Sequence, residues 1–269
     1  MICFPNAKIN LGLHVVSKRP DGYHNLETVF YPLKIYDALE IIPGQKAGTD
    51  SLEESGYQVH GAPEDNLVMK AVRLMRAYYN FPPLDVYLLK KIPFGAGLGG
   101  GSADASFMLK LLNDTFSLGA SDNELATLAL KLGADCPFFI YNRPLYATGI
   151  GELFEPVDVN LQNYYFVLVK PEVHVSTKDA FSGIEPQASQ YLPKDIVKQP
   201  VEDWKNLLKN DFEKTVFAKY PLIEQIKSEL YQQGAVYASM SGSGSSVYGI
   251  FEKGHEIKSL SMPYFTLES

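Results

Sequence analysis

The chain has 269 residues, of which 46% are apolar and 20% are charged. This is the balance of an ordinary globular protein that buries a sizeable core. Its 24 basic and 31 acidic residues give a formal net charge of −7, which argues against broad nucleic-acid binding because that function needs a basic surface. An anionic small substrate stays open, since a single pocket can be positive on an acidic protein.

The sequence also argues against a membrane span, a disulfide framework and a structural metal. No apolar run approaches the length of a bilayer span, and Lys8 and Asn10 interrupt residues 1–16, which therefore do not read as a signal peptide. Cys3 and Cys136 lie far apart, and the five histidines are scattered. We therefore expect a cytoplasmic protein with no disulfide and no dedicated metal site.

Two apolar stretches at the amino terminus, residues 9–16 and 28–42, predict strands joined by the turn-rich segment KRPDGYHNL. Asn6, Lys8 and Asn10 have the same parity, so a strand would point all three to one face. Taken alone, such a polar face is more often solvent-exposed than functional.

The next stretch, residues 43–62, is polar and glycine-rich and reads as a hairpin excursion. A helix is then predicted from Asp65 to about Asn80, where Pro82 follows. Its expected buried stripe is Val68, Ala71, Val72 and Met75.

Residues 85–92 predict a strand, and PFGAGLGGGSADASFMLKLL follows from Pro93. Five glycines fall within residues 95–101, and an apolar helix face comes next: Ala105, Met108, Leu109 and Leu112. A glycine loop that opens a helix suits phosphate, because glycine lets the backbone approach an anion and the helix N-terminus offers unpaired N–H groups. A plain turn is the alternative. No Lys follows the glycines as in the Walker pattern, and the dinucleotide fingerprint fits poorly.

Another helix is expected over residues 121–132, with Ser121 and Glu124 as a capping box and Gly133 at its end. The segment ADCPFF follows directly. Without further information, Asp135 in that segment would more often be a helix cap than a catalytic base.

In the remaining chain, residues 144–151 predict a turn, 154–162 a link to a second lobe, and 164–170 a strand. Residues 183–200 predict an exposed loop, and 201–218 and 221–233 predict helices. The strands expected at 235–240 and 246–251 flank SGSGS, which alone is more often a plain hairpin turn.

These segments together resemble one family. The loop is similar to the P-x-x-x-G-L-G-G-G-S-[AS]-[DN]-A motif of the GHMP small-molecule kinases. SGSGS resembles the third motif of the same family. One branch of the family is similar over further segments, in the expected order: PNAKINLGLHV with DGYHNLETVF, LGADCPFF and HVSTKDAF, with Cys136 where Val or Ile is more usual. This branch phosphorylates the 2-hydroxyl of a cytidyl diphosphate of methylerythritol in non-mevalonate isoprenoid precursor synthesis.

The resemblance implies an α+β fold with two lobes: an N-terminal ribosomal-S5-like, ATP-binding lobe over residues 1–155 and a C-terminal ferredoxin-like lobe over 156–269. It implies Asp135 as the catalytic base and Lys8 as the lysine that assists it. It implies ATP and Mg²⁺ as cofactors, with Ser102 the one candidate metal ligand. Asp104 is ambiguous, because a first-turn acid favours the helix dipole but would repel phosphate.

The resemblance also assigns the binding residues. The nucleotide-binding set is the loop with two positions for the adenine side: Pro93, Gly95, Gly97, Leu98, Gly99, Gly100, Gly101, Ser102, Ala103, Asn66 and Lys90. The substrate-binding set is Asn10, Tyr23, His24, Thr177, Phe181, Ser241 and Gly242. Tyr23 and Phe181 would sandwich the cytosine ring, with His24 at its edge.

The expected partner is a small cytidyl diphosphate substrate, with no nucleic acid and no membrane, and the expected state is a monomer or weak homodimer. Two alternatives remain. The first is another GHMP kinase of the homoserine or mevalonate type, against which the D-G-Y-H and S-T-x-x-x-F segments count. The second is a non-catalytic nucleotide- or RNA-binding module, against which Lys8, Asp135 and the acidic charge balance count.

Overall fold

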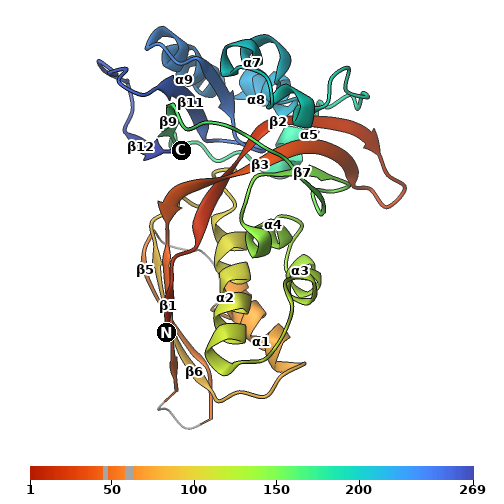
Figure 1. Ribbon diagram of the computed structural model, residues 1–269, viewed down its shortest axis with the longest axis vertical. Coiled ribbons are helices and arrows are strands. Elements are labelled where there is room, and N and C mark those ends of the chain that lie inside the picture. The colour runs from red at the N-terminus through yellow and green to blue at the C-terminus, as the bar shows by residue number, and fades with distance from the viewer. Residues whose placement is uncertain (45–47, 58–62) are drawn as a thin grey trace. The chain divides into compact units, whose positions relative to one another are not determined.

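The computed structural model describes residues 1–44, 48–57 and 63–269, which fold into two compact units (Figure 1). Unit 1 comprises residues 1–7, 35–94 and 99–143, and unit 2 comprises residues 8–34, 95–98 and 144–269. The predicted division into two lobes at residue 155 stays a prediction.

Unit 1 contains a four-stranded sheet in the order β1-β4-β6-β5. Its strands are β1 (Ile2–Cys3), β4 (Ala38–Pro43), β6 (Leu84–Lys90) and β5 (Ser51–Gly56). β5 runs parallel to β6, whereas β4 pairs with β6 antiparallel. The hairpin predicted for residues 43–62 is therefore wrong where it can be tested, because β5 pairs with β6 and not with the preceding β4. Residues 45–47 and 58–62 of that prediction lie outside the described residues.

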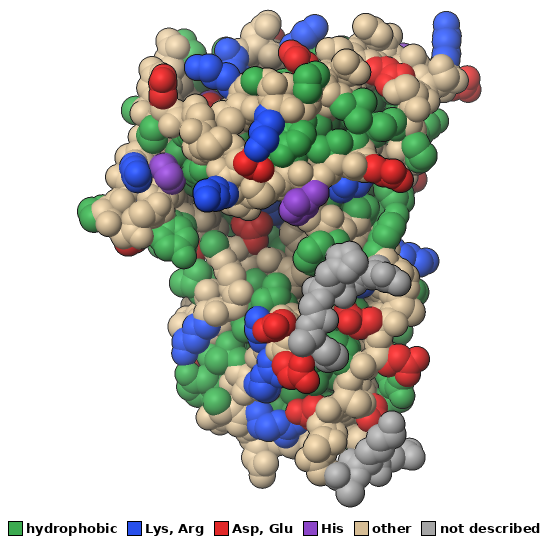
Figure 2. Space-filling view, turned by 180° about the vertical axis from the view of Figure 1, so that it is seen from behind, with side chains coloured by type: hydrophobic (Ala, Val, Ile, Leu, Met, Phe, Trp, Pro, Cys, Tyr) green, Lys and Arg blue, Asp and Glu red, His purple; other side chains and the backbone are tan. Residues whose placement is uncertain are grey.

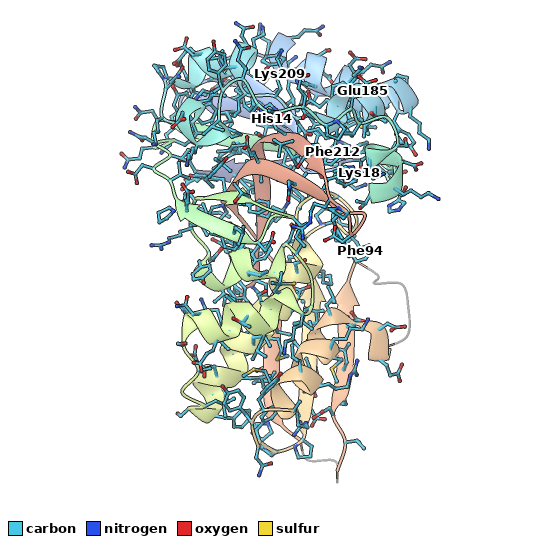
Figure 3. All side chains as sticks on the ribbon, turned by 90° about the vertical axis from the view of Figure 1, so that its right-hand side faces the viewer. His14, Lys18, Phe94, Glu185, Lys209 and Phe212 are labelled. Carbon is cyan, nitrogen blue, oxygen red and sulfur yellow. The ribbon has the colours of Figure 1, made fainter. Side chains whose placement is uncertain are left out.

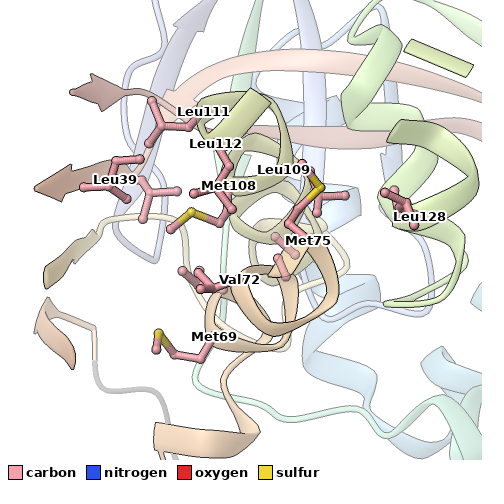
Figure 4. Packing of buried hydrophobic residues seen from close by; sticks show 14 of the residues in the cluster. Leu39, Met69, Val72, Met75, Met108, Leu109, Leu111, Leu112 and Leu128 are labelled. Atoms are coloured by element: carbon pink, nitrogen blue, oxygen red, sulfur yellow. The ribbon is translucent and has the colours of Figure 1, made fainter. Parts of the chain in front are cut away.

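The described residues of unit 1 form the short 3₁₀ helix Pro63–Asp65 and four α-helices: α1 (Leu67–Arg76), α2 (Gly100–Phe116), α3 (Asp122–Leu130) and α4 (Cys136–Tyr141). The predicted apolar stripes of α1 and α2 are confirmed, and Figure 4 shows Met108, Leu109 and Leu112 of α2 beside Met75 of α1. α1 begins later than expected because the Asn66 side chain accepts the N–H of Val68 at 2.8 Å and so caps the helix.

α3 carries the predicted capping box between Ser121 and Glu124. The helix ends at Leu130, before Gly133, and Lys131 is its C-cap in the right-handed helical conformation. The helix therefore ends earlier than the glycine predicted. The backbone N–H of Gly133 still bonds the carbonyl of Ala129.

Unit 2 contains two four-stranded sheets, in the orders β2-β3-β7-β8 and β10-β11-β9-β12. The first is built from β2 (Asn6–Lys18), β3 (His24–Tyr36), β7 (Leu145–Thr148) and β8 (Leu153–Pro156), and two residues each of β2 and β3 belong to unit 1. The second is built from β9 (Tyr164–Val169), β10 (Tyr237–Met240), β11 (Val247–Glu252) and β12 (Tyr264–Glu268). The predicted turn at 144–151 is wrong over β7, which pairs with both β3 and β8. Only residues 149–151 remain for the turn, and the glycines there hid the short strand before them.

The helices of unit 2 are α5 (Thr177–Phe181), α6 (Pro193–Ile196), α7 (Val201–Leu207), α8 (Phe212–Lys219) and α9 (Pro221–Gln232). The helix predicted over 201–218 is two helices, because the chain between them pairs with β2: Asn210 bridges to Leu13, and the Asn210 side chain accepts the N–H of Phe212 at 3.0 Å. The loop predicted over 183–200 contains α6.

The predicted α+β class is confirmed by this mixture of sheets and helices. Among the described residues, no helix has the length and apolar character needed to cross a bilayer. Figure 2 shows acidic and basic side chains interspersed on the face in view, without a large patch of one sign.

Candidate active site

The glycine loop has the conformation that glycine makes possible. Gly95, Gly97 and Gly99 have φ angles of +60°, +74° and +71°, in the left-handed region that disfavours other residues. A Cβ atom on Gly97 would lie 2.1 Å from the backbone oxygen of Ser241, a distance that no real contact permits. Glycine is therefore required at Gly97 both by its backbone angle and by its neighbour.

The loop leads into an uncapped helix N-terminus. Gly99 is the N-cap of the 17-residue helix α2, so no side chain caps it, and the first turn holds no acid. The first intrahelical bond joins the N–H of Ala103 to the carbonyl of Gly99. The N–H groups of residues 100–102 and the positive end of the helix dipole can therefore serve an anion.

The SGSGS turn holds the part of the loop that belongs to unit 2. The hydroxyl of Ser241 donates to the carbonyl of Gly97 at 2.9 Å, and the N–H of Ser246 donates to the carbonyl of Ala96 at 3.2 Å. β2 contributes a third bond, from the N–H of Lys8 to the carbonyl of Leu98 at 2.9 Å. The turn between β10 and β11 therefore supports the glycine loop and is more than a hairpin connection.

Unit 1 contains a buried ion cluster made by residues that flank the glycine loop in sequence and by Asp37. The ammonium of Lys90 lies between the carboxylates of Asp37 and Asp104, 2.6 Å from the latter, and all three side chains are buried. Asp37 also accepts the N–H of Ile92 at 2.8 Å. Since Lys90 and Ile92 precede the loop and Asp104 follows it, the cluster joins the two ends of the loop.

This cluster changes the interpretation of two predicted residues. The ammonium of Lys90 is engaged by two buried carboxylates, so the geometry favours a supporting role under the loop over contact with adenine. Asp104 points to Lys90, which resolves the ambiguity left by the sequence. The carboxylates of Asp104 and Asp37 raise the pKa of Lys90 against the opposing effect of burial.

Lys8 and Asn10 lie side by side on β2, as their parity predicts, and both are buried. The ammonium of Lys8 donates to Oδ1 of Asn10 at 2.8 Å and lies 4.8 Å from the ring centroid of Phe30. The amide of Asn10 donates to the hydroxyl of Thr28 at 3.0 Å, and Thr28 donates to the carbonyl of Gly12. A Cβ atom on Gly242 would lie 3.4 Å from Oδ1 of Asn10, so the SGSGS turn is close to this pair.

His24 and Phe181 lie together. Their rings stack with centroids 4.7 Å apart and an interplanar angle of 23°. Tyr23 is 61% exposed, and Thr177, the first residue of α5, is exposed as well. The arrangement thus differs from the predicted sandwich of Tyr23 and Phe181: His24, not Tyr23, covers the Phe181 ring.

The other predicted residues belong to unit 1. Asp135 is the N-cap residue of α4, yet its side chain makes no capping hydrogen bond to that helix, so the plain helix-cap interpretation does not account for it. Asn66 caps α1 and donates to Glu54 at 2.7 Å. Lys8 belongs to unit 2 and Asp135 to unit 1, so their joint role stays a prediction.

Sequence reasoning missed three polar residues that hold these groups in place: Thr28, Asp37 and Asn210. All three are buried. The amide of Asn210 donates to the carbonyls of Met240 and Gly242 at 2.8 and 2.9 Å and so fixes the start of the SGSGS turn. Asp37 could have been suspected from the sequence because it lies between two apolar strands, in the segment KIYDALEII.

Comparison with family models places both halves of the chain in one group. The model described as GHMP kinases N terminal domain matches residues 66–143, and the model described as GHMP kinases C terminal matches residues 194–260.

Curated relatives match over nearly the whole chain. The 4-diphosphocytidyl-2-C-methyl-D-erythritol kinase of Bacteroides fragilis (strain YCH46) is 58% identical over 258 residues, which cover 96% of this chain and 94% of the relative. The kinase of the same name from Parabacteroides distasonis is 55% identical over 262 residues, 97% of this chain and 96% of the relative.

Solved structures agree. A crystal structure of 4-(cytidine 5'-diphospho)-2C-methyl-D-erythritol kinase superposes with a TM-score of 0.79 at 30% identity, covering 93% of this chain and 89% of that one. The Methanococcus jannaschii mevalonate kinase, at 15% identity and a TM-score of 0.71 over 100% and 98% of the two chains, shares the fold alone.

Proposed function

Because this chain belongs to the GHMP kinase family and is an ATP-dependent small-molecule kinase, we propose that its acceptor is 4-diphosphocytidyl-2-C-methyl-D-erythritol. The reaction transfers the γ-phosphoryl group of ATP to the 2-hydroxyl of that compound, a step of non-mevalonate isoprenoid precursor synthesis. One observation carries the choice of acceptor: relatives that bear the name of this kinase are 58% and 55% identical over nearly the full length of this chain.

We assign the triphosphate to the glycine loop and the start of α2. The positive φ angles of Gly95, Gly97 and Gly99 and the uncapped helix N-terminus support this assignment. The proposed contacts are Pro93, Gly95, Gly97, Leu98, Gly99, Gly100, Gly101, Ser102 and Ala103, with Asn66 on the adenine side. We propose that Lys90 acts through the ion cluster that holds the loop.

We assign proton transfer to Asp135. As the 2-hydroxyl oxygen forms its bond to the γ-phosphorus, its O–H bond breaks and the carboxylate of Asp135 takes the proton, while the bond between the γ-phosphorus and the bridging oxygen breaks and ADP leaves. We assign to the Lys8 ammonium the stabilisation of the negative charge on the attacking oxygen. Asp135 lies within residues 66–143, which match the N-terminal model of the kinase family, and this match supports its assignment to chemistry.

We assign the acceptor to residues of unit 2. His24 and Phe181 already form a stacked pair, which supports a role for them in binding the flat cytosine ring, and the exposed Tyr23 ring is available for the same role. Asn10 and Thr177 would orient the alcohol, with Ser241 and Gly242 supplying the turn beside Asn10. Polar groups that recognise a base edge discriminate strongly against acceptors without a base.

Transfer from a triphosphate also calls for Mg²⁺, which neutralises charge on the phosphate oxygens when bound. Across the described ranges, no three His, Cys, Asp or Glu side chains gather into a metal site. The chain thus fits a metal that is bound mainly by the nucleotide, with the Ser102 hydroxyl, a hard oxygen donor, as the one protein ligand we propose. We further propose a cytoplasmic location and a monomer or weak homodimer.

The position of the transferred group tests the acceptor assignment. Purified protein would be incubated with Mg-ATP and 4-diphosphocytidyl-2-C-methyl-D-erythritol, and the product examined by ³¹P and ¹³C NMR. We expect one new phosphomonoester, coupled to the carbon that bore the 2-hydroxyl. A phosphate on another hydroxyl would contradict the proposed reaction.

A further inference from the structure

A cavity lies in unit 2, and its lining contains none of the residues assigned above to ATP, to the acceptor or to proton transfer, although Asn210, which supports the SGSGS turn, is part of it. Its volume is about 590 Å³, within the range of small-molecule sites. His14 of β2, the segment 183–190, and residues of α7, α8 and α9 line it. Figure 3 labels His14, Glu185 and Lys209 on this side of unit 2.

Three carboxylates line the cavity, and two of them, Asp211 and Glu213, bind other parts of unit 2. Asp211 accepts the N–H of Val15 at 2.9 Å and lies 3.2 Å from Nδ1 of His14. Glu213 pairs with Lys227 at 2.6 Å and accepts the N–H of Met240 at 2.9 Å. These acids therefore hold β2 and β10 in place, and the charge of Glu213 is offset by Lys227.

The remaining lining is basic. Within the part of the chain that the structure describes, Lys209 and Lys214 form no ion pair, and Lys205 lies over the ring of Tyr231 at 4.5 Å. Glu185 is the third carboxylate and is exposed. With the Glu213–Lys227 pair set aside, three lysines face two carboxylates, Glu185 and Asp211, and this net positive charge favours an anionic ligand.

Two polar atoms of the lining lack a partner. Nε2 of His14 and Oγ of Ser189 are buried and have no hydrogen-bond partner among the described residues. Buried polar groups are almost always hydrogen-bonded, so an unpaired pair in one cavity indicates groups that a ligand would satisfy. The position of the His14 ring is fixed by Asp211 at its other nitrogen.

The lining also indicates the kind of anion. The aromatic residue in it, Tyr237, is 1% exposed, packs edge-on against Trp204 and donates its hydroxyl to the carbonyl of Leu208 at 3.0 Å, so its face is not free to stack on a base. The side chains of Gln187, Ser189 and Gln190 offer hydrogen bonds instead. We propose that this cavity binds a small phosphorylated polyhydroxy compound, with the phosphate at Lys209 and Lys214 and the hydroxyls at His14 and Ser189.

The fluorescence of a tryptophan beside the lining can report ligand binding. Trp204 is the single tryptophan, is fully buried, and lies 5.7 Å from the ring of Tyr237. Titrations with ribose phosphate, inorganic phosphate and AMP would be followed by Trp204 fluorescence and by calorimetry, with excess ADP present to occupy the glycine loop. The test variant is Lys209→Gln with Lys214→Gln, and the charge-matched control is Lys253→Gln with Lys258→Gln, two exposed lysines outside the cavity.

We expect ribose phosphate to bind the wild type and the control equally, and the test variant at least about tenfold more weakly. Three results would overturn the proposal: no binding of ribose phosphate, an equal loss in both variants, or binding of AMP or inorganic phosphate as tight as that of ribose phosphate. Because ADP occupies the loop throughout, the outcome is independent of the reaction proposed above.

Discussion

Nζ of Lys90 lies 2.6 Å from Oδ2 of Asp104, inside the unit that carries the start of α2. The same ammonium pairs with Asp37, so one buried lysine serves two buried carboxylates. Asp37 accepts N–H groups of Lys91 and Ile92, whereas Oδ1 of Asp104 has no hydrogen-bond partner among the described residues. Oδ1 of Asp104 is therefore free to bind a proton. Burial, with the charge of Asp37, raises the pKa of Asp104 to about 7.

The first prediction concerns stability and pH. The pKa of Asp104 is higher in the folded protein than in the unfolded chain, where it is 3.8. The protonated carboxyl therefore stabilises the fold fully below pH 3.8, and this stabilisation is lost as the pH rises to about 7. The unfolding free energy of the wild type should fall between pH 5 and 8, and in Asp104→Asn this fall should be smaller by about 2 kcal/mol. Urea unfolding at the two pH values measures this change. Asp114→Asn, exposed on the same helix, should leave it as in the wild type; an unchanged pH dependence in Asp104→Asn would contradict the account.

The second prediction concerns the glycine loop. Gly97→Ala forces a Cβ atom against the backbone oxygen of Ser241 and should lower the unfolding free energy or raise the KM for ATP at least tenfold. Gly101→Ala is the matched control, because its Cβ would meet only Leu67 at 3.6 Å, an ordinary contact, and its N–H is kept. Thermal melts and ATP kinetics on both variants decide the matter. If the two variants have the same melting temperature and the same KM for ATP, the conformation of the loop is not required for ATP binding.

The third prediction concerns the base. Asp135→Asn should lower kcat by about three orders of magnitude, since an amide cannot take the proton of the hydroxyl, while ATP binding measured by calorimetry stays unchanged. Asp122→Asn, at an exposed position in the first turn of α3, is the control. Near-normal turnover in Asp135→Asn would remove Asp135 from the chemistry.

The fourth prediction concerns the acceptor. His24→Ala removes one ring of the stacked pair and should raise the KM for the cytidyl substrate about tenfold or more with the KM for ATP unchanged; Tyr23→Ala should act in the same direction. Tyr191, 55% exposed in the same unit, provides the control variant Tyr191→Ala. If neither variant changes the acceptor KM, these rings do not hold the base.

The fifth prediction concerns the cysteines. Burial raises the pKa of Cys3 to about 12 and that of Cys136 to about 11, so neither thiol forms much thiolate at neutral pH. We expect native protein to react with iodoacetamide far more slowly than urea-unfolded protein, with mass spectrometry as the readout. Rapid labelling of Cys136 in the native protein would contradict its buried environment.

Much of this fold could be predicted because its signals are local. Helical periodicity identified α2, a capping box identified α3, and the density of glycine identified the loop before Gly100. The errors arose where distant segments decide the outcome. β5 pairs with β6 in parallel, and the helix around Asn210 is interrupted by pairing with Leu13, and neither pairing leaves a mark in the nearby sequence.

The same division holds for the site. Motif positions such as Lys8, Asn10 and Gly97 could be named from the chain, since residue identity at fixed spacing carries the signal. The supporting residues could not, because Thr28, Asp37 and Asn210 act through hydrogen bonds to segments far away in sequence. A buried polar residue resembles an exposed one until its neighbours are known.

The most direct test of the central claim is a coupled assay of ADP release with Mg-ATP. It compares 4-diphosphocytidyl-2-C-methyl-D-erythritol with homoserine, mevalonate and no acceptor. We predict release only with the cytidyl compound, because that acceptor alone brings a base to His24 and Phe181. Release with homoserine or mevalonate in its place, or binding of ATP without release for any acceptor, would contradict the proposed function.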